Sequence, residues 1–113
     1  MTKRIRTQIA RGSAELAILA LLAEQSLYGF EISKRIAEKT DGALQFNLAS
    51  LYPMLYDLEK RGLVAGRWET NRAGRDRRYY CLTPIGKRKL APLRREWGFF
   101  FRALDSLAGV TRA

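Results

Sequence analysis

The chain has 113 residues, of which 47% are hydrophobic, enough for one compact domain and little more. Lys and Arg number 21 against 11 Asp and Glu, which gives a net charge of +10. This excess favours a polyanionic partner, either nucleic acid or an anionic membrane surface, although a basic domain with neither partner would have the same composition.

The residue types that are missing exclude several classes of protein. There is no histidine, which removes the commonest general base and the commonest metal ligand. Cys81 is the single cysteine, so an intrachain disulfide and a multi-cysteine zinc site are ruled out. We find no signal peptide, no apolar run long enough to span a bilayer, no Walker-type loop and no Gly-x-Ser-x-Gly motif. We therefore expect a cytoplasmic protein that is not an enzyme and has no metal, cofactor or membrane partner.

The N-terminal part predicts a basic segment followed by a buried helix. Residues 1–11 form either a short helix or a mobile arm, and their only charges are Lys3, Arg4, Arg6 and Arg11. These charges contact phosphate, pack on a partner subunit, or are simply solvated. Ser13 is predicted to cap the next helix, with Glu15 in its first turn. Residues 14–23 are apolar nearly all round, which predicts a central helix that touches its own domain and a neighbour.

A second helix is predicted over residues 28–40, after a break at residues 24–26. Its apolar residues are Phe30, Ile32 and Ile36, whereas Lys34 and its charged neighbours point outward. Gly29 in its first turn permits the close approach of another backbone. Residues 41–42 end this helix, and residues 43–46 are a connector.

A third helix is predicted over residues 47–62, and we interpret it as a DNA-recognition helix. Asn47 can cap it and Gly62 can end it. The inward face is defined by leucines at steps of three and four, namely Leu48, Leu51, Leu55 and Leu58. The opposite face is polar and aromatic, and consists of Asn47, Ser50, Met54 and Asp57 flanked by Tyr52, Tyr56 and Lys60. Asp57 is expected to pair with Arg61 one turn later. Three helices with short joins, the third of which has an exposed polar face, form a helix-turn-helix.

A β-hairpin is predicted after this helix, from strand-forming residues 63–70 and 78–82 around a turn at residues 71–76. Such a hairpin is a wing. Its tip and return strand hold Arg72, Arg75, Arg77 and Arg78. This clustering suggests contact with the minor groove or with phosphate, and the alternative is a solvated tip. Val64, Tyr80 and Leu82 are expected to face inward, whereas Tyr79 and Cys81 face away. Cys81 has no basic partner on its own face, which disfavours redox sensing.

The last helix is predicted over residues 84–108, with Thr83 as its cap and Pro84 at its first position. It carries a heptad seam of Leu90, Leu93, Trp97, Phe100, Leu104 and Leu107, widened by Phe99, Phe101 and Ala108. Its length of about 36 Å is too great to bury on one small domain, so we expect a dimerisation helix and not one folded back on its own core. Pro92 predicts a kink or break near Leu90.

With these residues in view, the chain resembles the PadR family of transcriptional regulators. The segments that carry the resemblance are Leu27–Ile32, Leu51–Leu55, Leu58–Leu63, Gly74–Thr83 and Gly86. They extend over residues 11–90, in order and at the family's spacing. The short C-terminal region resembles the branch with a single C-terminal helix. Ala49, where the family often has glycine, and Asp76, where proline is frequent, depart from the pattern. The resemblance implies a winged-helix dimer that represses transcription and often releases DNA when a small molecule binds.

The expected fold is mainly α with a small β-hairpin. Residues 1–83 would form a winged-helix DNA-binding domain with a basic N-terminal segment, and residues 84–113 a C-terminal dimerisation helix. Asn47, Ser50 and Tyr52 are expected at the major groove, where Asn can bond adenine bidentately. The residues assigned to the DNA backbone are Lys34, Lys60, Arg72, Arg75 and Arg77, and the family's tyrosine at the position of Tyr28 tends to meet phosphate.

The dimer and effector region is predicted around Trp97, because a two-fold axis at mid-seam would bring two copies of this residue together. A flat slot for a small aromatic ligand, or simple interface packing, would be built from Leu16, Ala20, Leu90, Leu93, Trp97, Phe100, Phe101 and Leu104. The expected function is that of a homodimeric repressor that binds a palindromic operator in double-stranded DNA and is released by an aromatic ligand at the dimer interface. The alternatives are a protein-binding winged-helix module and a non-specific architectural DNA binder.

Overall fold

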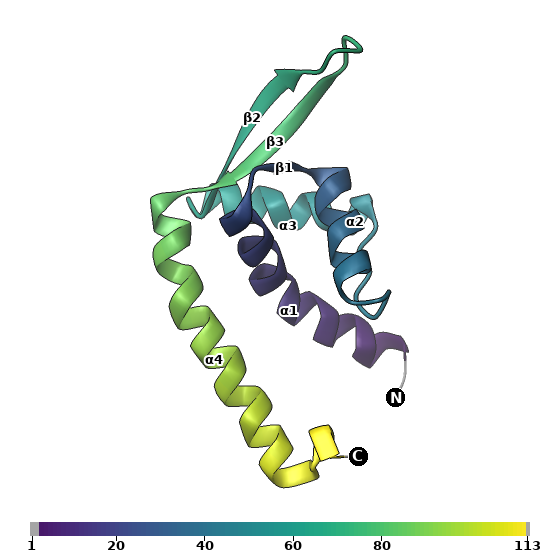
Figure 1. Cartoon of the computed structure of the whole chain (residues 1–113), viewed down its shortest axis with the longest axis vertical. Helices are drawn as coiled ribbons and strands as arrows, with labels where there is room; N and C mark the ends of the chain where they lie inside the picture. The colour runs from purple at the N-terminus through teal and green to yellow at the C-terminus, as the bar shows by residue number, and fades with distance from the viewer. Residues whose placement is uncertain (1–2, 113) are drawn as a thin grey trace.

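A computed structural model describes residues 3–112 of the chain, with side chains described over residues 13–111 (Figure 1). The elements in order are α1 (Lys3–Glu24), β1 (Leu27–Tyr28), α2 (Gly29–Lys39), α3 (Leu48–Lys60), β2 (Val64–Thr70), β3 (Asp76–Leu82), α4 (Pro84–Ala108) and a final 3-10 turn, η1 (Val110–Arg112). The prediction of a mainly helical winged-helix fold is confirmed.

Helix α1 begins earlier than the sequence analysis predicted. Its backbone is helical from Lys3 onward, so the proposed cap Ser13 lies inside the helix and the prediction of a separate cap there is wrong. No proline interrupts this stretch, and one interior glycine, Gly12, costs only about 1 kcal/mol. Residues 1 and 2 and the basic side chains of Lys3, Arg4, Arg6 and Arg11 lie outside what the structure describes.

The core is formed by one face of each of the first three helices. Its largest fully buried side chains are Ile18, Leu19, Leu27, Ile32, Leu51, Leu55, Leu58 and Val64. The leucine spacing of α3 therefore predicted its inward face correctly. Phe30, which was expected on the apolar side of α2, is instead 53% exposed and stacks on Tyr28 with ring centroids 6.4 Å apart.

The sheet contains one strand more than the predicted hairpin. Its order is β1-β3-β2 and both pairings are antiparallel, with Leu27 opposite Tyr80 in the first and Arg67 opposite Tyr79 in the second. β1 has two residues, too short for the alternation that identifies a strand in a sequence. Beyond β1 the pair β2–β3 continues alone, and this pair with its turn is the wing.

Helix α4 begins as predicted, because the Thr83 hydroxyl accepts a hydrogen bond from the Gly86 amide at 3.0 Å and Pro84 follows. Of the kink or break predicted near Leu90, the break is wrong, since α4 is continuous through Pro92. Pro92 has no amide proton to donate to the Arg88 carbonyl one turn earlier. Both residues are exposed, so water can satisfy this carbonyl and the helix does not need to break.

The wing and α4 leave the helical body in opposite directions (Figure 1). The radius of gyration is 15.5 Å, compared with about 13 Å for a compact domain of this length. The elongation reflects the free end of α4, because within that helix only Gly86 and Leu90 are buried.

Candidate nucleic-acid interface

Helix α3 is fixed at both ends by the residues that the sequence predicted. The Asn47 side-chain oxygen accepts a hydrogen bond from the Ser50 amide at 2.8 Å. Gly62 has a φ of +78°, the left-handed conformation that lets the chain turn into β2. A bidentate contact of Asn47 with adenine would therefore share its Oδ1 atom between the base and the helix cap.

The outward face of α3 differs from the predicted one. Half a turn from the buried leucines lies a row of exposed residues that we call the outer row, namely Ala49, Pro53, Tyr56 and Lys60. Met54, predicted to face outward, instead packs against the core, and Ser50 is half-buried. The other residues predicted to face outward are exposed as expected, namely Asn47, Tyr52, Tyr56, Asp57 and Lys60.

Pro53 stands in the middle of the outer row. A proline has no amide proton, so the Ala49 carbonyl one turn earlier has no helical partner. Both residues are exposed, so water can reach the freed carbonyl. The helix continues through this position.

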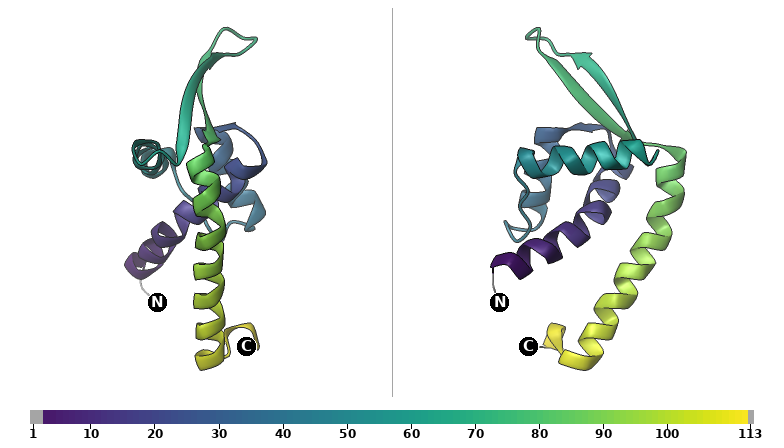
Figure 2. Two further views of the ribbon diagram at one scale, coloured as in Figure 1. Left: turned by 90° about the vertical axis from the view of Figure 1, so that its left-hand side faces the viewer. Right: turned by 180° about the vertical axis from the view of Figure 1, so that it is seen from behind.

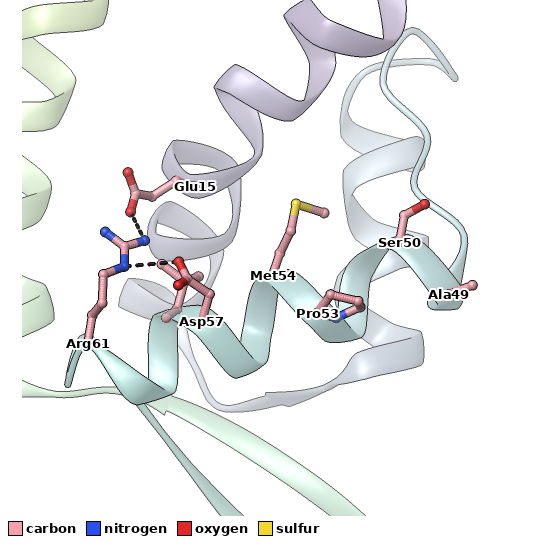
Figure 3. A pocket seen from close by; sticks show the side chains of 8 residues that line it. Glu15, Ala49, Ser50, Pro53, Met54, Asp57 and Arg61 are labelled. Carbon is pink, nitrogen blue, oxygen red and sulfur yellow. Dashed lines mark hydrogen bonds and ion pairs between the residues drawn. The ribbon is translucent and has the colours of Figure 1, made fainter.

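One flank of α3 faces α1 across an open groove (Figure 3). Arg61 reaches across it to the carboxylate of Glu15 on α1, and its Nε donates to Asp57 at 3.0 Å. The predicted pair of Asp57 and Arg61 is therefore confirmed. The hydrogen bond to Glu15 is the main cause that raises the pKa of Arg61 above its usual value. The C-terminal end of α3 is thus tied to α1.

The other flank of α3 packs against the start of α2. A Cβ atom on Gly29 would lie 2.8 Å from the Tyr52 ring, so only glycine fits beneath this tyrosine. The close approach predicted at Gly29 is real, but it involves a side chain and not a backbone. Tyr52 keeps 45% of its surface exposed and lies beside Tyr28 at the mouth of a hollow between α2, α3 and the wing.

The base of the wing is held to α3 by Glu59, a residue that the sequence analysis did not single out. Its carboxylate accepts from Arg78 Nη2 at 2.6 Å and from the Gly66 amide at 3.3 Å. A Cβ on Gly66 would lie 2.7 Å from the Arg78 Cζ atom, so glycine lets the guanidinium cross β2. Arg78 is therefore a structural residue, and a glycine inside a strand was the available sequence signal. Burial is the main cause that raises the pKa of the neighbouring Tyr80.

The tip of the wing presents unpaired positive charge. The Asn71 side chain accepts from the Ala73 and Arg75 amides, each at 2.9 Å, which closes the turn. Arg72 and Arg75 are exposed, and neither has an ion pair among the described side chains. Near the start of β3, the Arg77 guanidinium lies 4.4 Å from the centre of the Tyr28 ring, which is a cation–π contact.

The remaining cations that were assigned to the DNA backbone have different surroundings. Lys60 is exposed at the end of the outer row. Lys34 is also exposed, but its Nζ lies 3.8 Å from the Glu38 carboxylate, which offsets part of its charge. Figure 2 shows α3 standing out from the body on one side, with the wing rising beside it. Helix α3 and the wing are thus neighbouring projections of the molecule.

Helix α4 exposes the C-terminal half of its predicted seam. Leu90 is buried and Leu93 half-buried against the chain's own core, whereas Phe100, Leu104 and Leu107 are 49%, 40% and 87% exposed. The alternative of a helix folded back on its own core therefore holds only for the first turns. Phe99 is 71% exposed and lies about 200° around α4 from Trp97, so we now expect it outside the seam.

Trp97 is at the centre of an aromatic cluster. Its ring contacts Phe100 and Phe101 at centroid distances of 5.8 and 5.7 Å. Leu16 and Ala20, predicted to complete a slot around this tryptophan, pack instead against the core of their own chain. Only a second subunit would place α1 residues opposite the cluster.

Across the described residues, no three His, Cys, Asp or Glu side chains come together as a metal site. No helix in this part of the chain has both the length and the apolar character of a membrane span.

These features define a winged helix-turn-helix protein, with α3 at the recognition position and β2–β3 as the wing. A family model described as the transcriptional regulator PadR-like family matches residues 18–92, and the chain belongs to this family. Its members are transcriptional regulators that bind DNA, are generally dimeric and are not enzymes. The resemblance seen in the sequence is thereby confirmed.

Individual relatives agree with this assignment. An uncharacterised protein of Lysinibacillus sphaericus is 36% identical over 101 residues, which cover 89% of this chain and 93% of that protein. A transcriptional regulator from Clostridium thermocellum has 31% identity and a TM-score of 0.81, with 89% of this chain and 98% of that chain covered. A PadR-like transcriptional regulator from Bacillus cereus has 27% identity and a TM-score of 0.77, with 88% and 95% covered.

Proposed function

We propose that this regulator is a homodimeric repressor that binds a palindromic operator and releases it when a small aromatic ligand binds between the two copies of α4. Residues 1–83 would form the DNA-binding unit and residues 84–113 the dimerisation unit. A repressor of this kind acts on chromosomal DNA in the cytoplasm.

The observation that carries the proposal is the position of the outer row beside the wing. Lys60 ends the outer row, and Arg72 and Arg75 project from the wing tip without ion pairs among the described side chains. A helix in the major groove with a basic hairpin beside it can contact base edges and phosphates together. Lys34, Asn47, Ser50 and the Tyr28–Tyr52–Arg77 group would add contacts at the edges of this surface.

The exposed part of the α4 seam supports dimerisation. Phe100 and Leu104 expose large apolar surfaces, and each would gain roughly 1.5–3 kcal/mol on full burial. A two-fold axis near Trp97 would bury both copies of this surface and set the distance between the two α3 helices. Aromatic walls formed by two Trp97–Phe100–Phe101 clusters, with Leu16 and Ala20 of the opposing subunit, suit a planar ligand. Such a ligand would release DNA if it favoured a dimer whose α3 spacing misses the ~34 Å groove repeat.

The DNA contact is tested with the double variant Arg72→Gln/Arg75→Gln. Loss of two phosphate contacts should reduce the slope of log affinity against log salt by about 1.8. The control is Arg88→Gln/Arg95→Gln on α4, which removes the same charge from exposed positions outside the proposed surface. Equal slopes for the two double variants would remove the wing from the interface. A slope change without preference for any selected duplex would favour the architectural alternative, and no DNA binding at all would favour the protein-binding one.

Dimerisation is tested with a pair of charge insertions on opposite sides of α4. Phe100→Glu places a charge in the seam and should give monomers in sedimentation at micromolar concentration, whereas Phe99→Glu, on the far side, should leave the dimer intact. If both variants sediment like the unmodified chain, the seam is not the interface. For the ligand, planar aromatic compounds should quench Trp97 fluorescence saturably in a Trp68→Phe background, and no response would exclude the slot.

A further inference from the structure

Helix α3 carries a backbone acceptor on the surface that we assign to DNA. Pro53 has no amide proton, so it cannot donate to the Ala49 carbonyl one turn earlier. The helix nevertheless continues through both residues, and both are exposed (Figure 3). The side chain of Ala49 is a single methyl group, which can neither donate to this oxygen nor fold over it. A donor on a bound molecule can therefore reach the Ala49 carbonyl.

The side-chain acceptors near this oxygen have partners or are less exposed. Asn47 Oδ1 accepts a hydrogen bond from the Ser50 amide at 2.8 Å, and Ser50 itself is half-buried. The first turn of α3 has no acidic residue, and Asp57, about two turns after Ala49, is bonded to Arg61. At the N-terminal end of the outer row, the acceptor that α3 itself leaves unused is thus a backbone oxygen.

DNA presents matching donors in the major groove. The exocyclic amino groups of adenine (N6) and cytosine (N4) are hydrogen-bond donors there, whereas thymine O4 and guanine O6 are acceptors. A carbonyl oxygen in the groove therefore favours adenine or cytosine and disfavours thymine or guanine. This discrimination requires no polar side chain, because the acceptor belongs to the backbone of the helix.

We propose that the Ala49 carbonyl, freed by Pro53, accepts a hydrogen bond from the exocyclic amino group of one adenine or cytosine in each half-site of the operator. The inference rests on the proposed function, because it requires α3 in the major groove. Pro53 contributes to specificity by withholding an amide proton, and Ala49 contributes by leaving its oxygen uncovered. The discrimination should be about fivefold in affinity, as expected for one neutral hydrogen bond.

The substitution Pro53→Ala removes the free acceptor without adding charge. Alanine at this position donates its amide proton to the Ala49 carbonyl and should stabilise α3, so a loss of recognition cannot result from unfolding. The matched control is Pro92→Ala in α4, which returns an amide proton to the Arg88 carbonyl at exposed positions outside the proposed surface. A second control, Ala49→Gly, removes the methyl group and keeps the carbonyl.

The contact is located with a duplex selected by the unmodified chain. Each adenine is replaced in turn by purine and each cytosine by 2-pyrimidinone, because these analogues lack the exocyclic amino group. At one position in each half-site, the replacement should raise the Kd about fivefold for the unmodified chain and both controls, and less than about 1.5-fold for Pro53→Ala. Comparison on the same duplex cancels the effect of the weaker base pair on the DNA itself. At an adenine bound by Asn47, by contrast, Pro53→Ala would lose as much affinity as the unmodified chain.

Equal penalties for the unmodified chain and Pro53→Ala at every adenine and cytosine would refute the backbone contact and leave DNA binding intact. Loss of the same penalty in Pro92→Ala would show that the Ala49 oxygen is not its cause. Replacement of thymine by uracil, which removes only a methyl group, detects a shifted helix. If Pro53→Ala changes the penalty at thymine as much as at adenine or cytosine, the whole helix has moved and the proposed contact is refuted. If the unmodified chain selects no duplex, the proposed function fails and this inference fails with it.

Discussion

Replacing Glu59 by Gln tests whether one partly buried ion pair sets the position of the wing. Glutamine keeps an oxygen that can accept the Gly66 amide but removes the charge that holds Arg78. The side chains of Glu59 and Arg78 are 31% and 29% exposed, so the pair is intermediate between a surface and a buried ion pair.

The expected cost follows from this partial burial. Exposed pairs contribute about 0–1 kcal/mol, and breaking a buried pair costs about 3–5 kcal/mol. At the observed exposure we expect Glu59→Gln to cost about 1–2 kcal/mol, a factor of about 5–30 in the opening equilibrium of the wing. Gly66→Ala should cost a similar amount by displacing the Arg78 guanidinium, and the double variant should cost less than the sum because both changes remove one contact.

Amide hydrogen exchange of β2 and β3 measures this opening directly. The matched control is Glu69→Gln in the same strand pair, which breaks the exposed Arg67–Glu69 pair and should change exchange by less than about 1 kcal/mol. Equal exchange rates in Glu59→Gln and Glu69→Gln would refute the idea that Glu59 anchors the wing. Additive costs for Glu59→Gln and Gly66→Ala would show that the two changes act on separate contacts.

Three further predictions concern stability. Pro53→Ala should restore a hydrogen bond to the Ala49 carbonyl and raise the free energy of unfolding by about 1–3 kcal/mol in urea titrations, and an unchanged or lower value would show that the proline is fully accommodated. Leu58→Ala, at a position 2% exposed, should lower the free energy of unfolding by about 2–5 kcal/mol, and a loss below 1 kcal/mol would contradict its place in the core. The amide and hydroxyl of Thr111 donate to Asp105 and hold the pKa of Asp105 below its usual value, so the stability from this contact is present at neutral pH and is lost as pH falls through the lowered pKa. NMR signals of η1 should therefore shift in acid with an Asp105 titration that Asp105→Asn abolishes, and signals independent of pH would exclude the contact.

Much of the fold was predictable because its signals are local. The leucine spacing of α3, the cap at Asn47 and the Thr83-Pro84 start of α4 each lie within a few residues of the feature they determine. β1 was missed because a strand of two residues depends on its pairing with β3, which no short sequence window contains. The early start of α1 was missed because Ser13 resembles a cap, although helix can continue through it.

The candidate interface was predictable only in part. The arginines of the wing were identified by composition, but whether each is structural or free to bind DNA depends on its side-chain partners. Arg78 is structural because Glu59, on α3, accepts its hydrogen bond. Tertiary contact likewise places Met54 against the core and leaves Tyr56 in the outer row. Helical spacing limits which residues can share a face, and the neighbouring elements determine which of those faces remains available to a ligand.

The ion pair of Arg61 with Glu15 links the end of α3 to α1 (Figure 3). α1 also packs against α4, and the Thr83 cap of α4 donates to the Gly62 carbonyl just after α3, so a rotation of α4 can reach α3 by two routes. Helix α3 is about 20 Å long, and a tilt of about 5° at its tethered end displaces the other end by about 1.7 Å. Such a displacement exceeds half the length of a hydrogen bond, so in the proposed complex a small movement of α4 would be enough to take Asn47 out of reach of a base while the fold itself stays intact.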